Sequence, residues 1–268
     1  AWEEISKAGS PVLLLVDWMM PVMDGLELTR RIRACNSTLM SYVIIITSKL
    51  ESGDMVEGLD AGANDFITKP LDPTVLRARI DVGLRMLELQ GKLLKARDAL
   101  EYEANHDHLT GIPNRRSILG LLSGELSRSG TDGRRIAVGI LDLDRFKEIN
   151  DTHGHRVGDE AIIGFVGNIK AALRDVDSLG RLGGDEFLVV APVVDAGEAH
   201  ALFETLRAAI ADHAIPSSCG EIRVSASIGF AISNGSASID ELIAKADVAM
   251  YRAKNEGRNR VRHDGARK

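Results

Sequence analysis

The residues best suited to chemistry lie in one short stretch, residues 181–187, which reads Arg-Leu-Gly-Gly-Asp-Glu-Phe. Two adjacent glycines adopt positive backbone dihedrals at no steric cost, and an apolar run over residues 187–190 follows them. The pattern predicts a tight hairpin whose turn lifts Asp185 and Glu186 to the exposed tip of a sheet. Carboxylates in such a place are hard oxygen ligands, suited to Mg²⁺ and through it to a polyphosphate.

A second acidic group follows the apolar run over residues 136–141, which we expect to be a strand ending in Asp142-Leu143-Asp144. If this strand neighbours the hairpin in an antiparallel sheet, Asp142 meets Asp185 and Glu186. The three carboxylates would then form a cluster that holds one or two Mg²⁺ ions. The alternative for Asp142 is a solvated strand end or a helix N-cap.

The Gly-Gly-Asp-Glu-Phe string resembles the signature of diguanylate cyclases, which condense two GTP molecules into cyclic di-GMP. The resemblance implies a divalent metal cofactor, Mg²⁺ or in its place Mn²⁺. Its ligands would be Asp142, the backbone of Leu143, and Asp185. Glu186 would be a further ligand, or the group that helps to deprotonate the attacking hydroxyl.

The same resemblance implies six positions that bind GTP. Guanine presents N–H donors that a carboxylate accepts, together with acceptors that an amide reaches, and adenine lacks this donor set. Without the resemblance, Lys254 and Arg258 would be two cations that only satisfy the dipole at a helix end. The positions are Asn150 and Asp159 for guanine, Phe146 and Lys147 for the triphosphate, and Lys254 and Arg258 for its β- and γ-phosphates.

Arg174 and Asp177 stand three residues apart and shortly before the hairpin. They resemble the inhibitory site of these cyclases, where the cyclic di-GMP product binds away from the active site. Arginine can fork onto a phosphate while aspartate accepts from the base. The alternative is an ordinary surface ion pair at a helix end.

The first part of the chain, to about residue 85, alternates apolar runs with helical patterns. This alternation predicts a doubly wound parallel sheet, in which functional groups gather at the carboxyl ends of the strands. Those ends carry Asp17, Thr47 and Lys69. We expect strands over residues 12–16, 43–46 and 66–67, the first buried on both faces, and helices over residues 26–34 and 55–61.

These strand ends resemble a response-regulator receiver domain, a reading supported by the prolines and Asp-Gly that follow Asp17. Asp17 would accept a phosphoryl group from a cognate histidine kinase, with Thr47 and Lys69 binding that group and Phe66 as the aromatic switch. A receiver starts with a strand, a helix and a second strand, whereas this chain starts with a helical pattern over residues 2–8. We therefore expect an N-terminally incomplete receiver, in which Asp17 is phosphorylated poorly.

A long helix is predicted over residues 74–103, because no proline interrupts them. Apolar residues with four-three spacing are typical of the seam of a coiled coil. We expect a dimeric stalk that makes the protein a homodimer; the alternative is an amphipathic helix packed on its own domain. The seam consists of Val82, Met86, Leu89, Leu93, Ala96 and Leu100.

The composition excludes several classes of protein. The 268 residues are 44% hydrophobic and 27% charged, which is ordinary for a globular chain of about two domains. A net charge of −6 argues against a nucleic-acid partner, and no apolar run is long enough to span a membrane. Two distant cysteines, Cys35 and Cys219, are typical of reduced thiols in a cytoplasmic protein.

Three parts are therefore expected: a partial receiver over residues 1–85, a helical linker over residues 86–106, and a GGDEF domain over residues 107–268. The fold class is α/β for the receiver and α+β for the cyclase, the latter a ferredoxin-like antiparallel sheet of the palm and nucleotide-cyclase kind. The predicted function is an active diguanylate cyclase with product inhibition. The alternatives are a catalytically silent receptor for cyclic di-GMP or GTP, a plain phosphorelay protein, and a purine cyclase acting on one nucleotide.

Overall fold

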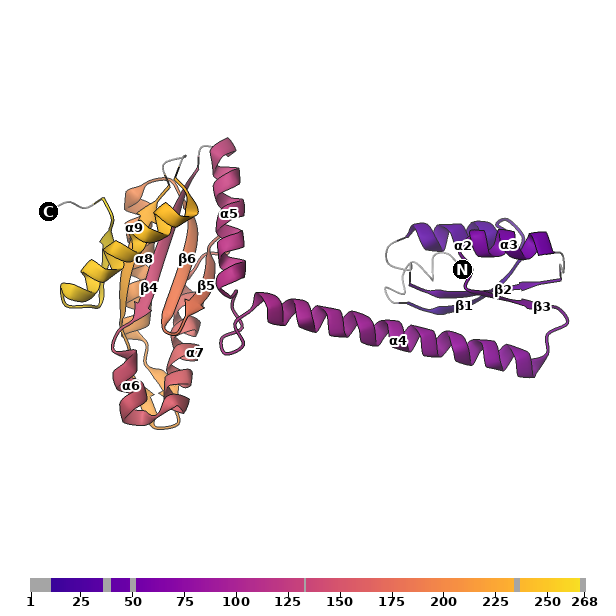
Figure 1. Ribbon diagram of the computed structural model, residues 1–268, viewed down its shortest axis with the longest axis horizontal. Coiled ribbons are helices and arrows are strands. Elements are labelled where there is room, and N and C mark those ends of the chain that lie inside the picture. The colour runs from indigo at the N-terminus through magenta and orange to yellow at the C-terminus, as the bar shows by residue number, and fades with distance from the viewer. Residues whose placement is uncertain (1–10, 36–39, 49–51, 133, 234–236, 266–268) are drawn as a thin grey trace. The chain divides into compact units, whose positions relative to one another are not determined.

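The computed structural model describes residues 11–35, 40–48, 52–132, 134–233 and 237–265 (Figure 1). The helix expected over residues 2–8 lies outside them. The chain divides into two compact units, here called the N-terminal unit (Ala1–Leu100) and the C-terminal unit (Glu101–Lys268). Within the described ranges, no helix is both long enough and apolar enough to cross a membrane.

The N-terminal unit contains the expected parallel sheet. Strands β1 (Leu13–Asp17), β2 (Tyr42–Thr47) and β3 (Asp65–Thr68) lie in that order, and helices α2 (Gly25–Ala34) and α3 (Ser52–Asp60) lie on one side of it (Figure 1). The prediction that β1 is buried on both faces is wrong at Leu15, which is 42% exposed. The reason is its place in the sheet, since β1 pairs only with β2 among the strands that the structure describes.

Helix α4 (Pro73–Asn105) is the long helix expected between the two parts. Its first half packs on the N-terminal sheet, where Leu76 and Leu87 meet a small cluster that includes Tyr42. Gly83 permits the close approach, because a Cβ there would lie 2.7 Å from side-chain atoms of both Leu13 and Tyr42. Much of the predicted coiled-coil seam is exposed, at Val82, Met86, Leu89, Leu93 and Leu100. The first half of α4 therefore packs on its own domain, as one alternative has it, whereas the dimeric stalk stays a prediction.

The C-terminal unit contains a five-stranded sheet in the order β10-β9-β4-β6-β5. The pairs β9–β4, β4–β6 and β6–β5 are antiparallel, as expected, but the edge strand β10 runs parallel to β9. The expectation of a wholly antiparallel sheet is corrected at that edge. The bounds are Arg135–Leu143 for β4, Ser178–Gly183 for β5, Glu186–Val193 for β6, Ala226–Ile232 for β9 and Arg260–His263 for β10; a separate hairpin joins β7 (Ile215–Ser217) to β8 (Gly220–Ile222).

Helices cover both faces of this sheet (Figure 1). Because side chains alternate along a strand, β4 sends Ala137 and Leu141 into one core and Val138 and Ile140 into the other. Helices α7 (His155–Ala172) and α8 (Ala196–Asp212) close the first core. Helices α5 (Arg115–Asp132) and α9 (Ile239–Asn255) close the second, and the short helix α6 (Phe146–His153) follows β4.

Candidate active site

The hairpin predicted from the adjacent glycines is present between β5 and β6. Gly183 pairs with Glu186, so the turn consists of Gly184 and Asp185, and Glu186 is the first residue of β6. Gly184 has a φ of +54°, a left-handed conformation that suits glycine. The turn therefore presents the two acids as expected, one at its tip and one at the start of the strand.

Arg181 ties this turn to the start of the C-terminal unit. Its guanidinium donates to the carbonyl of Gly184 over 3.0 and 2.7 Å and to Asp107 over 2.9 Å, and the arginine side chain is only 10% exposed. Asp107 also accepts from the amide and hydroxyl of Thr110. Burial alone would raise the pKa of Asp107, but these hydrogen bonds outweigh it and lower the pKa.

Asp142 meets the hairpin acids because β4 and β6 are antiparallel neighbours. Asp142 stands opposite Glu186 in the register, and the amide of Leu143 donates to the carbonyl of Asp185 over 3.2 Å. Only 5% of Asp142 is exposed, so the alternative of a solvated strand end is wrong. Its carboxylate accepts from the Lys254 ammonium over 2.6 Å.

The environment of Asp142 shifts its acidity. Burial, with a smaller contribution from the negative charges of Asp185 and Glu186, raises its pKa to about 6, although Lys254 opposes the shift. A carboxylate desolvated beside two other acids is destabilised as an anion. A cation at this place would relieve that destabilisation, so the donor set fits a divalent metal.

The carboxylates do not form a ready-made metal cage. In the part of the chain that the structure describes, no group of three His, Cys, Asp or Glu side chains is close enough to hold a metal ion. The expectation of a preformed three-carboxylate cluster is corrected accordingly, since Lys254 occupies one oxygen of Asp142. Magnesium is commonly held by one or two carboxylates together with substrate phosphates, so this sparser arrangement still fits it.

Helices α6 and α7 carry the residues predicted to bind guanine and the triphosphate. The Asn150 side-chain oxygen is buried and has no hydrogen-bond partner among the described residues, which is unusual for a buried polar atom and fits a ligand that supplies a donor. Asp159 is exposed at the start of α7. Phe146 and Lys147 form the first turn of α6, where helix amides are not used within the helix and suit phosphate.

The second pair of predicted phosphate-binding residues lies at the end of α9. Lys254 is in its last turn and reaches Asp142, whereas Arg258 lies in the turn that follows the helix and is exposed. Sequence reasoning missed Asp144, which is 6% exposed and binds this turn. Its signal in the sequence was only its place two residues after Asp142.

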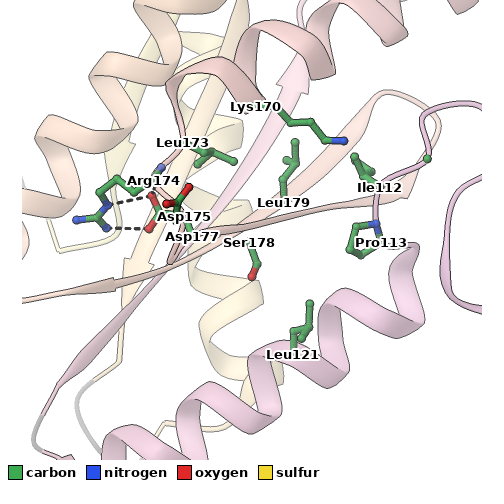
Figure 2. Close-up of a pocket in the computed structure, with 11 residues that line it drawn as sticks. Ile112, Pro113, Leu121, Lys170, Leu173, Arg174, Asp175, Asp177, Ser178 and Leu179 are labelled. Carbon is green, nitrogen blue, oxygen red and sulfur yellow. Dashed lines mark hydrogen bonds and ion pairs between the residues drawn. The ribbon is translucent and has the colours of Figure 1, made fainter. Parts of the chain in front are cut away.

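Arg174 and Asp177 form a closed pair beside a hollow of about 450 Å³ (Figure 2). The guanidinium donates to Asp177 over 2.8 and 3.0 Å, to Glu198 over 2.7 Å, and to the carbonyl of Pro192 over 3.0 Å. Sequence reasoning did not foresee Glu198. The predicted inhibitory pair is therefore held by partners of its own chain.

In the N-terminal unit, the residues predicted to form the phosphoacceptor site lie at the carboxyl ends of the strands. The Lys69 ammonium lies 2.6 Å from Asp17, and this contact is the main reason that the pKa of Asp17 is lowered. Thr47 is buried at the end of β2, and Phe66 is half-buried against the core beneath it. The structure thus brings together the residues expected at the strand ends.

Comparison with known proteins agrees with both units. The sequence matches the family described as "Diguanylate cyclase, GGDEF domain" over residues 104–260 and the response regulator receiver domain over residues 1–81. The response regulator PleD of Caulobacter vibrioides (strain NA1000 / CB15N) is 32% identical over 258 residues, which cover 95% of this chain and 57% of that protein. The diguanylate cyclase DgcM of Escherichia coli (strain K12) is 38% identical over 164 residues, or 61% of this chain and 39% of that protein.

A solved structure of the coiled coil and GGDEF domain of DgcB from Caulobacter crescentus, in complex with c-di-GMP, is 28% identical to this chain with a TM-score of 0.63. The aligned region covers 70% of this chain and 98% of the DgcB chain. The chain spans little more than half the length of its curated relative PleD. With the fold, the hairpin motif and these matches in agreement, the chain belongs to the GGDEF diguanylate cyclase family and also carries a response regulator receiver domain.

Proposed function

We propose that this chain is a diguanylate cyclase, which condenses two GTP molecules into cyclic di-GMP and releases two pyrophosphates. The observation that carries the proposal is the meeting of buried Asp142 with Asp185 and Glu186 where β4 ends and β6 begins, beside Lys254. Family membership favours the same reaction.

The proposed cofactor is Mg²⁺, with Mn²⁺ as a substitute, held by Asp142, the Leu143 carbonyl, Asp185 and Glu186. When bound, the metal neutralises charge on the substrate phosphates and polarises the reacting phosphorus. With a metal bound to Asp142, Lys254 would be released from that carboxylate and could bind the substrate phosphates.

In the proposed reaction the 3′-hydroxyl oxygen of one GTP forms a bond to the α-phosphorus of the other. The bond from that phosphorus to the pyrophosphate breaks, and Glu186 accepts the hydroxyl proton. Lys254 and Arg258 stabilise the departing pyrophosphate charge, and Phe146 and Lys147 hold the triphosphate. A second, identical step closes the ring, so the chemistry depends mainly on positioning and on charge neutralisation.

Asn150 and Asp159 are the proposed guanine-binding residues. The unpaired buried oxygen of Asn150 supports this role, because a donor on the base would satisfy it. Gly158 makes room for it: a Cβ at this position would lie 1.9 Å from that oxygen. Selection of GTP over ATP follows, since adenine does not present the same donors.

The proposal requires a homodimer, because one such site holds one GTP and two sites must face each other. The exposed apolar residues of α4, which include Leu89, Leu93 and Leu100, support a parallel coiled coil between two copies. A histidine kinase would phosphorylate Asp17 and so bias this pairing. The output of this signalling would be cyclic di-GMP made in the cytoplasm.

Product inhibition through Arg174 and Asp177 is also proposed. Cyclic di-GMP would have to displace Glu198 from the guanidinium, since this carboxylate competes with a product phosphate for the same donors. Replacing Arg174 with Ala should leave the initial rate intact and abolish the slowing as product accumulates. A variant that is still inhibited would contradict this role.

The test of the proposed function is product formation from GTP and Mg²⁺, resolved by chromatography, with Asp185→Ala as the control. Cyclic di-GMP from the parent alone supports the cyclase. A parent that makes none at any protein concentration favours the second candidate, a silent receptor for cyclic di-GMP or GTP, which the hollow beside Arg174 supports. Activity that appears only at high concentration indicates weak pairing instead.

A further inference from the structure

Asp144 is a buried acid for which the proposed reaction has no role. Its carboxylate accepts from the hydroxyls of Ser225 and Ser227, both over 2.6 Å, and from the backbone amide of Asn259 over 3.0 Å. Both of its oxygens are therefore engaged by donors, which sets it apart from Asp142. Because side chains alternate along β4, Asp142 and Asp144 project toward the face of the sheet that α9 covers.

The amide that Asp144 holds belongs to a turn with an unfavourable backbone. After α9, Gly257, Arg258 and Asn259 have φ values of +115°, +63° and +42°. Two consecutive non-glycine residues in the left-handed region are strained, and such strain persists only where the surroundings impose it. Strained residues of this kind cluster where a protein pre-organises a ligand site.

Two side chains impose the conformation of this turn. Asp144 binds the Asn259 amide from the buried side, and Arg207 donates to the Asn259 side-chain oxygen over 2.9 Å from α8. The Arg258 amide also donates to the carbonyl of Ala253, which closes the end of α9. The turn is thus held at its backbone and at a side chain.

What the turn presents is the Arg258 side chain. This side chain is exposed, and within the described ranges it makes no hydrogen bond or ion pair, unlike Lys254 one helical turn earlier. A long cationic side chain that has no partner and lies beside an acidic site can bind an anion. The direction in which it extends depends on the conformation of the turn that Asp144 and Arg207 hold.

We propose that Asp144 is a positioning residue for the substrate triphosphate. By holding the strained turn, it orients Arg258 toward the β- and γ-phosphates, while the nucleoside is bound elsewhere. The inference rests on the proposed function for the identity of the ligand, and it predicts a selective effect on the phosphate tail. Asp144 acts through Arg258 and touches neither the metal nor the substrate.

The test compares the binding of two nucleotides to the full chain in the presence of Mg²⁺, measured by calorimetry. One is 3′-deoxy-GTP, which cannot form the bond, and the other is GMP, which lacks the β- and γ-phosphates. In Asp144→Ala the affinity for 3′-deoxy-GTP should fall about tenfold, equivalent to the loss of one modest interaction, with little change for GMP. Asp144→Asn should retain most of the affinity, since an amide oxygen still accepts from the Asn259 amide.

A second background separates positioning from a general structural defect. In Arg258→Ala, the further change Asp144→Ala should cause no additional loss, because the residue through which it acts is gone. Equal losses for both nucleotides, or additive losses in the two backgrounds, would overturn the inference. If Asp144→Ala does not fold, Arg207→Met tests the same turn from its exposed side. An unchanged ratio of 3′-deoxy-GTP to GMP affinity in that variant would equally overturn it.

These outcomes are independent of the cyclase assay. A parent that binds 3′-deoxy-GTP through this turn but makes no cyclic di-GMP contradicts the proposed function and leaves the positioning role intact. A parent that makes the product while Asp144→Ala shows no selective loss contradicts the positioning role alone.

Discussion

The two units each contain an aspartate–lysine pair at the end of a strand, with the same separation and opposite electrostatics. Asp17 and Lys69 lie 2.6 Å apart in the N-terminal unit, and Asp142 and Lys254 lie 2.6 Å apart in the C-terminal unit. The Asp17 side chain is 38% exposed and its pKa is lowered, mainly by the hydrogen bond from Lys69. The Asp142 side chain is 7% exposed and its pKa is raised to about 6, mainly by burial.

The difference shows that a close ammonium does not by itself determine the state of a carboxyl group. Loss of hydration around Asp142, together with the charges of Asp185 and Glu186, outweighs its lysine. Asp17 faces solvent and stays ionised, as its proposed role as a phosphoacceptor requires. The ionised Asp142 carboxylate would be more stable with a divalent cation beside it than on its own.

The largest expected difference between the pairs is in catalysis. Asp142→Asn should reduce cyclic di-GMP formation by more than the roughly 10–100-fold typical of losing an outer-shell partner of a metal, because the substitution removes the charge of a proposed metal ligand. Asp17→Asn should leave the unphosphorylated rate nearly unchanged. The measurement is the initial rate with GTP and Mg²⁺, and equal losses in the two variants would remove the functional distinction between the pairs.

The pH dependence of stability should also differ in sign. The pKa of Asp142 in the folded protein, about 6, exceeds its usual value of 3.8, so its contribution to stability is fully present below about pH 4 and is lost as the pH rises through 6. The loss amounts to as much as about 3 kcal/mol, at 1.36 kcal/mol for each pKa unit. Asp17 contributes in the opposite sense, with stability present above its usual pKa of 3.8 and lost as the pH falls through its lowered value.

Hydrogen exchange of the β4 amides between pH 4 and 8 measures this effect, because it reports the opening of the C-terminal unit alone. Asp142→Asn should be increasingly stabilised relative to the parent as the pH rises. Asp17→Asn is the matched control and should follow the parent in β4. A constant difference between Asp142→Asn and the parent over this range would show that burial does not raise this pKa.

Removing the lysines should have a smaller effect. At pH 8, Lys254→Met leaves the ionised Asp142 buried without its cation, which we expect to destabilise the C-terminal unit by about 2 kcal/mol, less than for a fully buried pair. Lys69→Met should not measurably change the stability of the N-terminal unit, since exposed ion pairs contribute little. Exchange of the β4 amides measures the first variant and exchange of the β2 amides measures the second, and a larger loss from Lys69→Met would reverse the comparison.

The smallest expected effect concerns the turn that brings the hairpin acids to Asp142. Gly184→Ala meets no atom within 4 Å of its new Cβ but must keep a φ of +54°, so the variant should lose about 1 kcal/mol from backbone strain alone. Gly120→Ala is the matched control. Its new Cβ also meets nothing within 4 Å, but Gly120 lies within helix α5. That variant should be stabilised by roughly 0.5–1 kcal/mol, as expected for alanine in a helix.

Much of the fold was predictable because its signals are local. The apolar runs predicted β2 and β4 to within a residue or two, and the proline-free stretch predicted α4. The adjacent glycines predicted the turn before Glu186, since few other residues adopt a positive φ there. The exposure of Leu15 and the parallel pairing of β10 were missed, because both depend on which strands become neighbours.

The sequence by itself determined which residues are predicted to carry the chemistry. Residue types and spacing selected Asp142, Asp185 and Glu186, and the same reasoning selected Asp17 with Lys69. Only the tertiary structure decided their state, because burial and opposing charges come from segments far apart in the chain. Lys254 reaches Asp142 from α9, Glu198 closes on Arg174 from α8, and Asp144 holds a turn more than a hundred residues away. Hydration and electrostatic potential are sums over neighbours in space, and for that reason a linear pattern names these groups without giving their pKa values or partners.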